Sequence, residues 1–538
     1  MMLTTLTSLF SSFLLAAAPG GAAGDKNLLS NPGMESGGSL SVSGWMEIWP
    51  RSLGAGSPPA FETSDEAPPE GKRSATIRVE YAGGYTSYTQ EVKLPRGTRS
   101  VRFTGMARVD RPSEAGGASL LLTFITEDPT KPAIKSSVRL TDETDWTRLE
   151  VTANVPEGVD RVLARCGVYG PCEASFDDCA LTASRDEVSA GQVRTAILDA
   201  TAVARTDVEE PWVRVSIPAP IGGQTPLGIR VTSEPEDAVL ALAVAADREN
   251  RALEVRLRPM AKGVDIALRV ETWTLLHDRV LSNGRGIELA APKRMPKDVK
   301  AYLEGAPGVD VDAPEVVEAA SGVQTDDLHA AMTTVAEILR ERMTYSGGGD
   351  QGSIHCLESG KGVCTGYANT AAALLNASGV PTRILACVYP DTRLQEHYIV
   401  EAWTPALGWS RMESTGGLFP YPDSSAVILR VVYPDSWRSA GSVPLYSDAS
   451  EGMACRFRMD ENFCFQGGET ITSFAFDEGT LDALQSKGRS ALKALERTPA
   501  EGSRWSAFPD ADRAPKDARD LIASLGEWLA TDGEVVPN

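Results

Sequence analysis

Three short segments carry one cysteine, one histidine and one carboxylate in chain order. Cys364 lies in Gly-Val-Cys-Thr-Gly-Tyr-Ala, His397 in Glu-His-Tyr, and Glu413 in Gly-Trp-Ser-Arg-Met-Glu-Ser-Thr. A thiol attacks an amide as its thiolate, so it needs an imidazole to take its proton, and the imidazole needs an acceptor that fixes its tautomer. We therefore predict Cys364 as the nucleophile, His397 as the base and Glu413 as the carboxylate that orients His397.

Two other residues compete for these roles. Glu401 would share a strand face with His397, because side chains two apart on a strand point the same way, so it is the alternative orienting carboxylate. His355 lies close to Cys364 in sequence and could line the same cleft, although nothing in the pattern requires it. Cys364 could also be structural, because a cysteine in an exported protein is more often half of a disulfide than a nucleophile.

The segments around these residues predict the elements that hold them. Residues 367–378 are dense in alanine and leucine and are followed by Gly379 and Pro381, which is typical of a helix and its end. Cys364 would then lie at the helix N-terminus, where the helix dipole lowers a thiol pKa and backbone N–H groups can face an oxyanion. Residues 382–389 and 397–403 read as strands, and residues 325–342 as an amphipathic helix that packs beneath the first one.

These residues together resemble the transglutaminase-like superfamily. The resemblance rests on Gly-x-Cys at 362–364, Gly-Val-Pro-x-Arg at 379–383, a strand that begins with His397, and Gly408-Trp409 followed by an acidic residue. It covers about residues 320 to 420 and implies an α+β, papain-like core. This chain has Glu413 where the family usually has aspartate, so the carboxylate must reach the imidazole from a slightly different backbone position.

The resemblance implies acyl transfer on a protein or peptide substrate but leaves the reaction open. The superfamily includes cross-linking transglutaminases, proteases, deglycosylating amidases and members without activity. Hydrolysis and amine transfer therefore both remain, as does an inactive exported protein that binds carbohydrate or protein. The proposed chemistry requires no cofactor.

The whole chain is expected to be multidomain. Residues 1–23 read as a signal peptide because an apolar run is followed by small residues. Residues 24–185 are predicted to form a jelly-roll β-sandwich, 190–300 a second small β-sandwich, 310–435 the catalytic core, and 436–538 a C-terminal extension with helices at 479–496 and 514–530.

The region 24–185 resembles the jelly-roll carbohydrate-binding modules of bacterial exported enzymes. The resemblance rests on Asn-Leu-Leu-Ser-Asn-Pro-Gly-Met-Glu at 27–35 and on Phe-Asp-Asp at 176–178. It implies a structural calcium ion held by Glu35 with Asp177 or Asp178, since oxygen ligands suit a hard cation. Rings that could stack on a glycan, or equally lie in the core, are Trp45, Trp49, Tyr81, Tyr85 and Tyr88.

Eight cysteines leave the disulfide pattern open. Cys166, Cys172 and Cys179 could pair locally, Cys455 with Cys464 could link a hairpin, and Cys356 with Cys387 would leave Cys364 free.

The net charge of −21 over 538 residues argues against nucleic acid or an anionic membrane as a partner. No segment after the first residues is long and apolar enough to span a bilayer. We therefore expect an exported protein, periplasmic or extracellular.

Overall fold

The structure is a computed structural model. It describes residues 26–38, 41–49, 58–65, 71–80, 85–112, 116–125, 134–140, 143–156, 158–186, 188–278, 284–347, 349–388, 397–434, 447–457, 465–476 and 478–508. The predicted signal peptide, Tyr81, Cys464 and the predicted helix at 514–530 lie outside these ranges.

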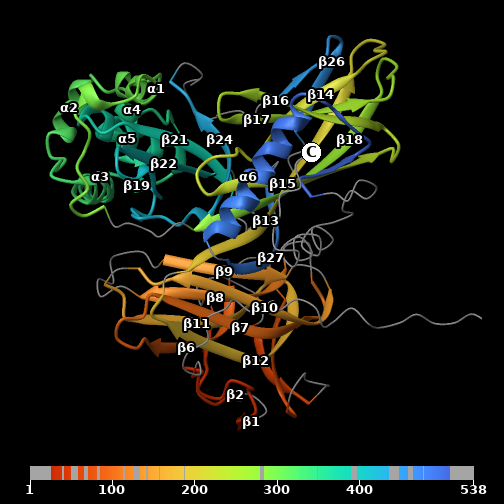
Figure 1. Cartoon of the computed structure of the whole chain (residues 1–538), viewed down its shortest axis with the longest axis vertical. Helices are drawn as coiled ribbons and strands as arrows, with labels where there is room; N and C mark the ends of the chain where they lie inside the picture. Colours follow the sequence, from red (N-terminus) through yellow and green to blue (C-terminus); the bar gives the residue numbers. More distant parts are fainter. Residues whose placement is uncertain are drawn as a thin grey trace, which may run out of the picture.

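The N-terminal part is a β-sandwich (Figure 1). One sheet has the order β10-β7-β12-β5-β4, and the facing strands follow the order β9-β8-β11-β6-β3. The strands are β1 (Gly37–Gly38), β2 (Ser41–Val42), β3 (Met46–Ile48), β4 (Ala60–Ser64), β5 (Ser74–Val79), β6 (Tyr85–Lys93), β7 (Ser100–Val109), β8 (Gly117–Ile125), β9 (Ile134–Leu140), β10 (Thr144–Asn154), β11 (Arg161–Tyr169) and β12 (Cys172–Ser184). Their inward side chains form one apolar core.

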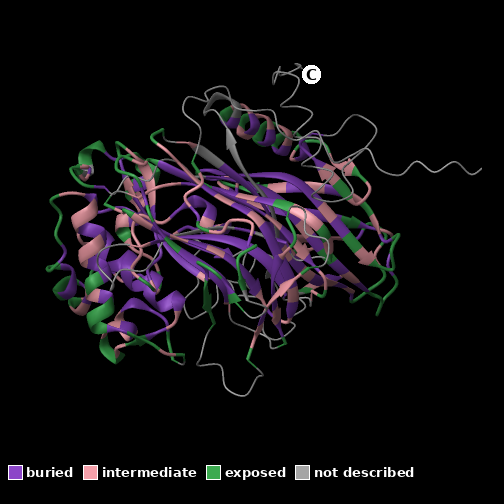
Figure 2. Cartoon of the chain, turned by 90° about the horizontal axis from the view of Figure 1, so that it is seen from below, coloured by how far each residue is buried: buried purple, intermediate pink, exposed green. Residues whose placement is uncertain are grey.

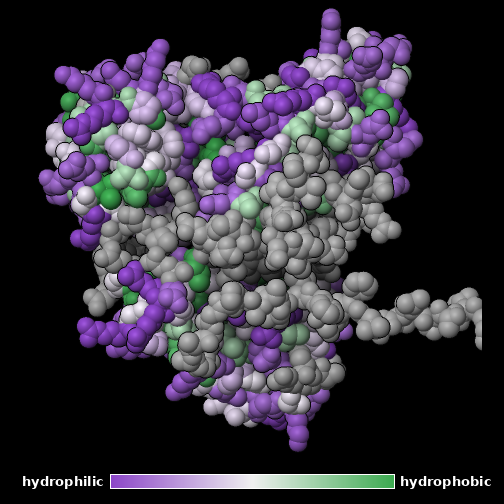
Figure 3. All heavy atoms as spheres, in the orientation of Figure 1, coloured by the Kyte–Doolittle hydropathy of each residue, from purple (hydrophilic) through white to green (hydrophobic). Residues whose placement is uncertain are grey.

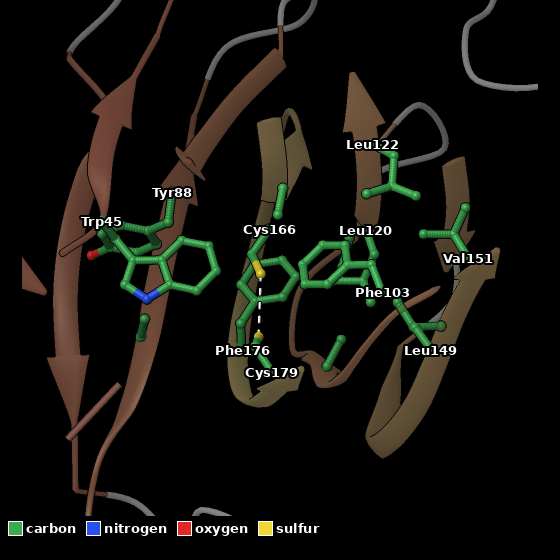
Figure 4. Close-up of a cluster of buried hydrophobic side chains, with 14 of the residues drawn as sticks. Trp45, Tyr88, Phe103, Leu120, Leu122, Leu149, Val151, Cys166, Phe176 and Cys179 are labelled. Carbon is green, nitrogen blue, oxygen red and sulfur yellow. Dashed lines mark hydrogen bonds between the residues drawn. The ribbon is translucent and has the colours of Figure 1, made fainter. Parts of the chain in front are cut away.

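Two thiols meet inside this core. Cys166 of β11 and Cys179 of β12 are buried, and their sulfur atoms are 3.4 Å apart (Figure 4). The two strands belong to opposite sheets, so the contact crosses the sandwich.

The predicted glycan-stacking residues divide between core and surface. Trp45 and Tyr88 are core residues (Figure 4). Tyr85 is half-buried, with its ring centroid 4.8 Å from that of Tyr169, and Trp49 is exposed.

The second part is another β-sandwich. One of its sheets has the order β25-β14-β17-β16-β28. The other has the order β29-β15-β18-β13-β27 and continues, through the pairing of β27 with β9, into the β9-β8-β11-β6-β3 strands of the first sandwich; β26 also pairs with β13. The strands are β13 (Ser189–Ala204), β14 (Trp212–Ile217), β15 (Gln224–Glu234), β16 (Val239–Asp247), β17 (Asn250–Leu257), β18 (Asp265–Asp278), β25 (Ser447–Ala449), β26 (Met453–Phe457), β27 (Phe465–Phe476), β28 (Ala500–Glu501) and β29 (Arg504–Ser506).

The structure differs here from the predicted division of the chain. The segments after residue 436 supply β25 to β29 to the second sandwich, so they complete that domain and are not a separate extension. Helix α6 (Glu478–Leu495) matches the first predicted C-terminal helix and packs on β15 (Figure 1). The sequence did not indicate this return, because strand pairing between positions more than 200 residues apart leaves no local signal.

The third part holds the predicted catalytic segments. Its sheet has the order β23-β22-β21-β24, and its helices α2 to α5 pack on one face of this sheet (Figure 1). The elements are η1 (Pro292–Arg294), α1 (Lys297–Lys300), η2 (Ala301–Glu304), α2 (Pro314–Ala320), α3 (Leu328–Arg342), β19 (Thr344–Tyr345), α4 (Ser353–Ser359), β20 (Lys361–Gly362), α5 (Cys364–Ala377), β21 (Thr382–Val388), β22 (His397–Thr404), β23 (Gly408–Met412), η3 (Asp423–Ser425) and β24 (Val427–Val432). In Figure 2 the strands are mostly buried, whereas the helices at this end expose one side.

Two buried side-chain amides join this sheet to the second sandwich. Asn250 donates to the carbonyl of Val431 at 2.9 Å and accepts from its N–H at 2.7 Å. Gln224 makes the same pair of bonds with Ile428, at 2.6 and 2.7 Å. The second sandwich therefore fixes β24 through the backbone.

The disulfide between Cys356 and Cys387, which the sequence left possible, does not form in the structure. Cys356 packs among the helices, whereas Cys387 belongs to the cluster on the opposite face of the sheet. Alternate residues of β21 point to opposite faces, which separates the two sulfur atoms. The pairing of Cys455 with Cys464 stays a prediction, because Cys464 lies outside the described residues.

The predicted fold class is confirmed, with β-sandwiches beside a smaller α+β part. Hydrophilic residues predominate on the face drawn in Figure 3, and hydrophobic atoms form small areas. Within the described ranges, no helix combines the length and apolar character that crossing a membrane requires.

Candidate active site

Cys364 is the first residue of helix α5. The N-cap residue Val363 has no side-chain acceptor, so it forms no hydrogen bond with the first backbone N–H groups of the helix. The prediction that Cys364 lies at a helix N-terminus is therefore confirmed, and its side chain is nearly buried, with 7% of the residue exposed. A helix N-terminus favours negative charge, which suits a thiolate.

His397 begins β22 and lies between the other two predicted residues. Its Nε2 is 2.9 Å from Glu413 Oε1, and its side chain also forms a hydrogen bond with Cys364. Because Nε2 faces the carboxylate, Nδ1 is the nitrogen left for the thiol. The structure thus brings together the three residues that the sequence singled out.

The charges around His397 favour its protonated form. Burial, the largest effect, lowers its pKa, but the hydrogen bonds and charges of Cys364 and Glu413 outweigh it and raise the pKa to about 9. Burial alone would raise the pKa of Glu413, but His397 and two backbone amides lower it overall. An imidazolium paired with a carboxylate is therefore the stable form at neutral pH.

A tight turn holds the Glu413 carboxylate. Oε1 accepts from the N–H of Thr415 at 3.0 Å and Oε2 from that of Gly416 at 2.6 Å. The backbone of Glu413 also pairs with Leu418 in both directions, at 3.0 and 2.9 Å. This turn provides the backbone position from which a glutamate, rather than an aspartate, reaches the imidazole.

Glu401, the alternative orienting carboxylate, has other partners. Its Oε2 accepts from Arg383 Nε and its Oε1 from Arg411 Nε, both at 2.8 Å. The residue is only 1% exposed, and although burial opposes ionisation, the two arginines lower its pKa. The geometry therefore favours Glu413 over Glu401 as the partner of His397.

A contact between Arg383 and Trp409 joins the two other motifs of the core. Arg383, from Gly-Val-Pro-x-Arg, lies over the ring of Trp409, from Gly-Trp, at 4.2 Å from the centroid. Arg383, Glu401 and Arg411 are also directly opposite one another across β21, β22 and β23. This row fixes the register that places Glu413 beside His397. Sequence reasoning missed it, although the charges at these positions were a usable signal.

His355 is not part of this group. It lies on α4, with its Nε2 2.9 Å from the position that a Cβ on Gly349 would take, and within the described residues no recorded contact joins it to Cys364 or His397. Tyr345 and Gln351, which the sequence analysis did not single out, lie closer. Tyr345 of β19 is opposite Gly362 of β20, two residues before Cys364, and Gln351 Oε1 accepts from the N–H of Val363 at 2.8 Å.

The residues predicted to hold calcium are only partly together. Glu35 and Asp177 both lie within about 4 Å of the position that a Cβ on Gly33 would take. However, Glu35 Oε1 accepts from the backbone of Lys72 and Arg73, and Asp178 pairs with Arg148 at 3.3 Å. Among the described residues no group of three or more His, Cys, Asp or Glu side chains could hold a metal ion. The arrangement does not fit a calcium site well, and the site stays a prediction.

Comparison with known families identifies the central part of the chain. Residues 315–414 match the model of the transglutaminase-like superfamily, a span that includes Cys364, His397 and Glu413. This segment is a transglutaminase-like domain. No curated protein matches the chain.

Solved structures are similar to parts of this chain at low sequence identity. A candidate cysteine protease from Cytophaga hutchinsonii is 12% identical, with 53% of this chain and 99% of that chain covered and a TM-score of 0.38. A xylan-binding domain from Paenibacillus barcinonensis is 16% identical, with 31% and 99% covered and a TM-score of 0.24. A carbohydrate-binding module in complex with β-1,4-galactotriose is 19% identical, with 30% and 99% covered and a TM-score of 0.22.

Proposed function

We propose that this protein is an exported thiol acyl-transfer enzyme that attacks an amide or peptide carbonyl through Cys364, His397 and Glu413. The observation that carries the proposal is the position of His397, hydrogen-bonded to Cys364 on one side and to Glu413 on the other. A histidine with only a structural role would need neither a thiol partner at a helix N-terminus nor a carboxylate that a backbone turn holds in place.

The acylation step follows from this geometry. The Cys364 thiolate attacks the carbonyl carbon, a C–S bond forms, and the carbonyl oxygen becomes an oxyanion near the Cys364 N–H. The oxyanion then collapses, the C–N bond breaks, and the His397 imidazolium gives its proton to the leaving amine. Glu413 keeps the charged imidazole in place throughout.

The second step resolves the thioester. Water or a primary amine attacks the carbonyl, neutral His397 accepts the proton, and the C–S bond breaks to regenerate the thiolate. Water makes the enzyme a hydrolase, and an amine makes it a cross-linker.

The reaction can be tested with the full chain and a glutamine-rich protein such as casein, with and without a fluorescent primary amine. Ammonia release is expected in both cases if the enzyme accepts glutamine side chains. Amine incorporation identifies a transferase, and cleaved peptide bonds identify a protease. Cys364→Ser should abolish every product. The proposal fails if that variant is as active as the wild type.

Export and glycan binding belong to the same proposal. The N-terminal sandwich would hold the glycan part of a glycoprotein or cell-wall substrate beside the thiol. Retention of the full chain on insoluble polysaccharides, compared with a chain that starts at residue 188, tests this role, and equal retention of the two would exclude it.

A further inference from the structure

The turn that holds the Glu413 carboxylate lies against helix α3. Its ends are the paired residues Glu413 and Leu418, and Gly417 directly precedes Leu418. A Cβ on Gly417 would lie only 3.1 Å from Ala336 Cβ and 3.3 Å from Arg340 Nη2, both on α3. Carbon atoms that are not bonded pack best about 3.5 to 4.0 Å apart, so the lack of a side chain at Gly417 allows this close approach.

The backbone of this turn, and not its hydroxyl groups, holds the carboxylate. Ser414 Oγ and Thr415 Oγ1 are buried, and among the described residues no hydrogen-bond partner is recorded for either atom. The N–H groups of Thr415 and Gly416 instead bind the Glu413 carboxylate. A shift of the turn backbone therefore moves the carboxylate that faces His397.

Helix α3 also contacts the helix that carries the thiol. The buried side of α3, which includes Leu328 and Leu339, lies in one apolar cluster with α5, which begins at Cys364. Phe419, just after the turn, is partly buried against this cluster, and its ring centroid is 6.5 Å from that of His329 on α3. One helix therefore supports both the element that carries the nucleophile and the turn that carries the carboxylate.

We propose that Gly417 is a positioning residue: because it has no side chain, the 413–418 turn can lie against Ala336, and this contact sets the distance between Glu413 and His397. The inference rests on the function proposed above for the thiol site. Gly417 has a φ of 69°, so a side chain there would cause backbone strain as well as a clash with α3. The two effects can be separated by experiment.

Gly417→Ala in the full chain should weaken the hold of Glu413 on the imidazole. The added Cβ pushes the turn away from Ala336, so the carboxylate moves away from His397. The pKa of His397 should then fall from about 9 to about 8. Histidine NMR titration, assigned by substitution, measures this change, and urea unfolding measures the stability of the same variant.

Gly286→Ala is the matched control for backbone strain. Gly286 has a φ of 67°, and apart from its chain neighbours no described heavy atom lies within 4 Å of the position that its Cβ would take. This variant therefore carries the strain without the contact. It should lose stability as Gly417→Ala does, but the pKa of His397 should stay at about 9.

A double variant tests the contact itself. Adding Ala336→Gly to Gly417→Ala removes the atom that the new Cβ meets, so the pKa of His397 should return to about 9. The stability should not return, because a glycine inside α3 is unfavourable and the strain at residue 417 remains. Ala336→Gly alone gives the stability reference for this variant.

Ala336→Val tests the same contact from the helix side if Gly417→Ala does not fold. It adds atoms next to Gly417 without changing the turn, and it should also lower the pKa of His397. A wild-type His397 titration in this variant, or in folded Gly417→Ala, would overturn the proposal. So would an equal shift in Gly286→Ala, or no recovery in the double variant.

The wild-type titration separates this proposal from the one on which it rests. If His397 of the wild type titrates near the ordinary value of 6.5, the pairing with Glu413 is refuted, and the function proposed for the thiol site fails together with this inference. If the wild-type pKa is raised but none of the contact variants changes it, only the role of Gly417 fails.

Discussion

Arg411 Nε lies 2.8 Å from Glu401 Oε1, and this buried pair lies on the strands that lead to the pair of His397 and Glu413. Glu401 follows His397 by four residues on β22, and Arg411 of β23 precedes Glu413, the residue after the end of that strand, by two. The two pairs therefore share one register. The position of His397 therefore depends on a buried charge network that includes neither Cys364 nor His397.

Removing the centre of this network should destabilise the core. Glu401→Gln leaves Arg383 and Arg411 buried without their shared carboxylate, and loss of one partner of a buried ion pair typically costs about 3 to 5 kcal/mol. We expect the urea midpoint to fall accordingly. The surface variant Glu91→Gln, which removes an exposed partner of Arg161, is the matched control and should cost less than about 1 kcal/mol. Equal stability of the two variants would contradict the network.

Replacing Glu413 should change His397 directly. In Glu413→Gln the imidazole loses its anionic partner, so its pKa should fall from about 9 toward the ordinary value of 6.5, and acylation should fall about 100-fold or more. The chain has four histidines, so their NMR titrations can be assigned by substitution. An unchanged His397 titration would show that Glu413 is not its partner.

Glu413→Asp tests the length of this side chain. The turn at 413–418 sets the backbone for a glutamate, so the shorter aspartate should lose contact with His397 and give an intermediate rate. Full activity of this variant would mean that the turn adapts to either residue.

Stability and activity should depend on pH in a defined direction. The pKa of His397 is raised to about 9, so its stabilising contribution is complete below pH 6.5 and is lost as the pH rises through 9. The pKa of Glu413 is lowered from 4.5, so its contribution is present above that value and is lost as the pH falls below it. Because His397 and Glu413 interact, the pKa values seen in such a titration describe the pair and not either residue alone.

Urea unfolding of the wild type and His397→Gln measures this effect. The difference in free energy of unfolding should be largest near pH 6 and should vanish near pH 10. Amide acylation should also decline above about pH 9, because the leaving amine then has no imidazolium to protonate it. A difference in stability that grows with pH would contradict the raised pKa.

The sequence predicted the site better than the domain that supports it. Cys364, His397 and Glu413 lie in local motifs that resemble those of the transglutaminase-like superfamily, and helix and strand periodicity placed Cys364 at a helix start and His397 on a strand. The position of Tyr345 near Cys364 was missed because it depends on a two-residue strand pair, and the return of β25 to β29 was missed because distant pairing leaves no local pattern. From the sequence, Glu401 could either orient His397 or form structural ion pairs. Only its contacts with Arg383 and Arg411 show that it forms the ion pairs.

The sulfur atoms of Cys166 and Cys179 should form a disulfide when the protein is exported. The two thiols lose two electrons and two protons to a disulfide oxidant, and closing a 13-residue separation contributes about 3 kcal/mol. Peptide mapping without reductant should find this pair linked in protein from an oxidising compartment. Cys166→Ala with Cys179→Ala should then melt no higher than the reduced wild type. Recovery of both thiols in alkylated form would contradict the pairing.

The most direct test of the central claim is site-resolved alkylation of the full chain by iodoacetamide from pH 5 to 10, with His397→Ala as comparison. The protein is first reduced, so that Cys455 is a thiol whether or not it pairs with Cys464. Burial raises the pKa of Cys455 to about 11, so this half-buried thiol should react only at high pH and serves as the internal control. We expect Cys364 to react already near pH 6 and His397→Ala to remove this reactivity. Reaction of Cys364 in parallel with Cys455, or no change in His397→Ala, would contradict the thiolate–imidazolium pair.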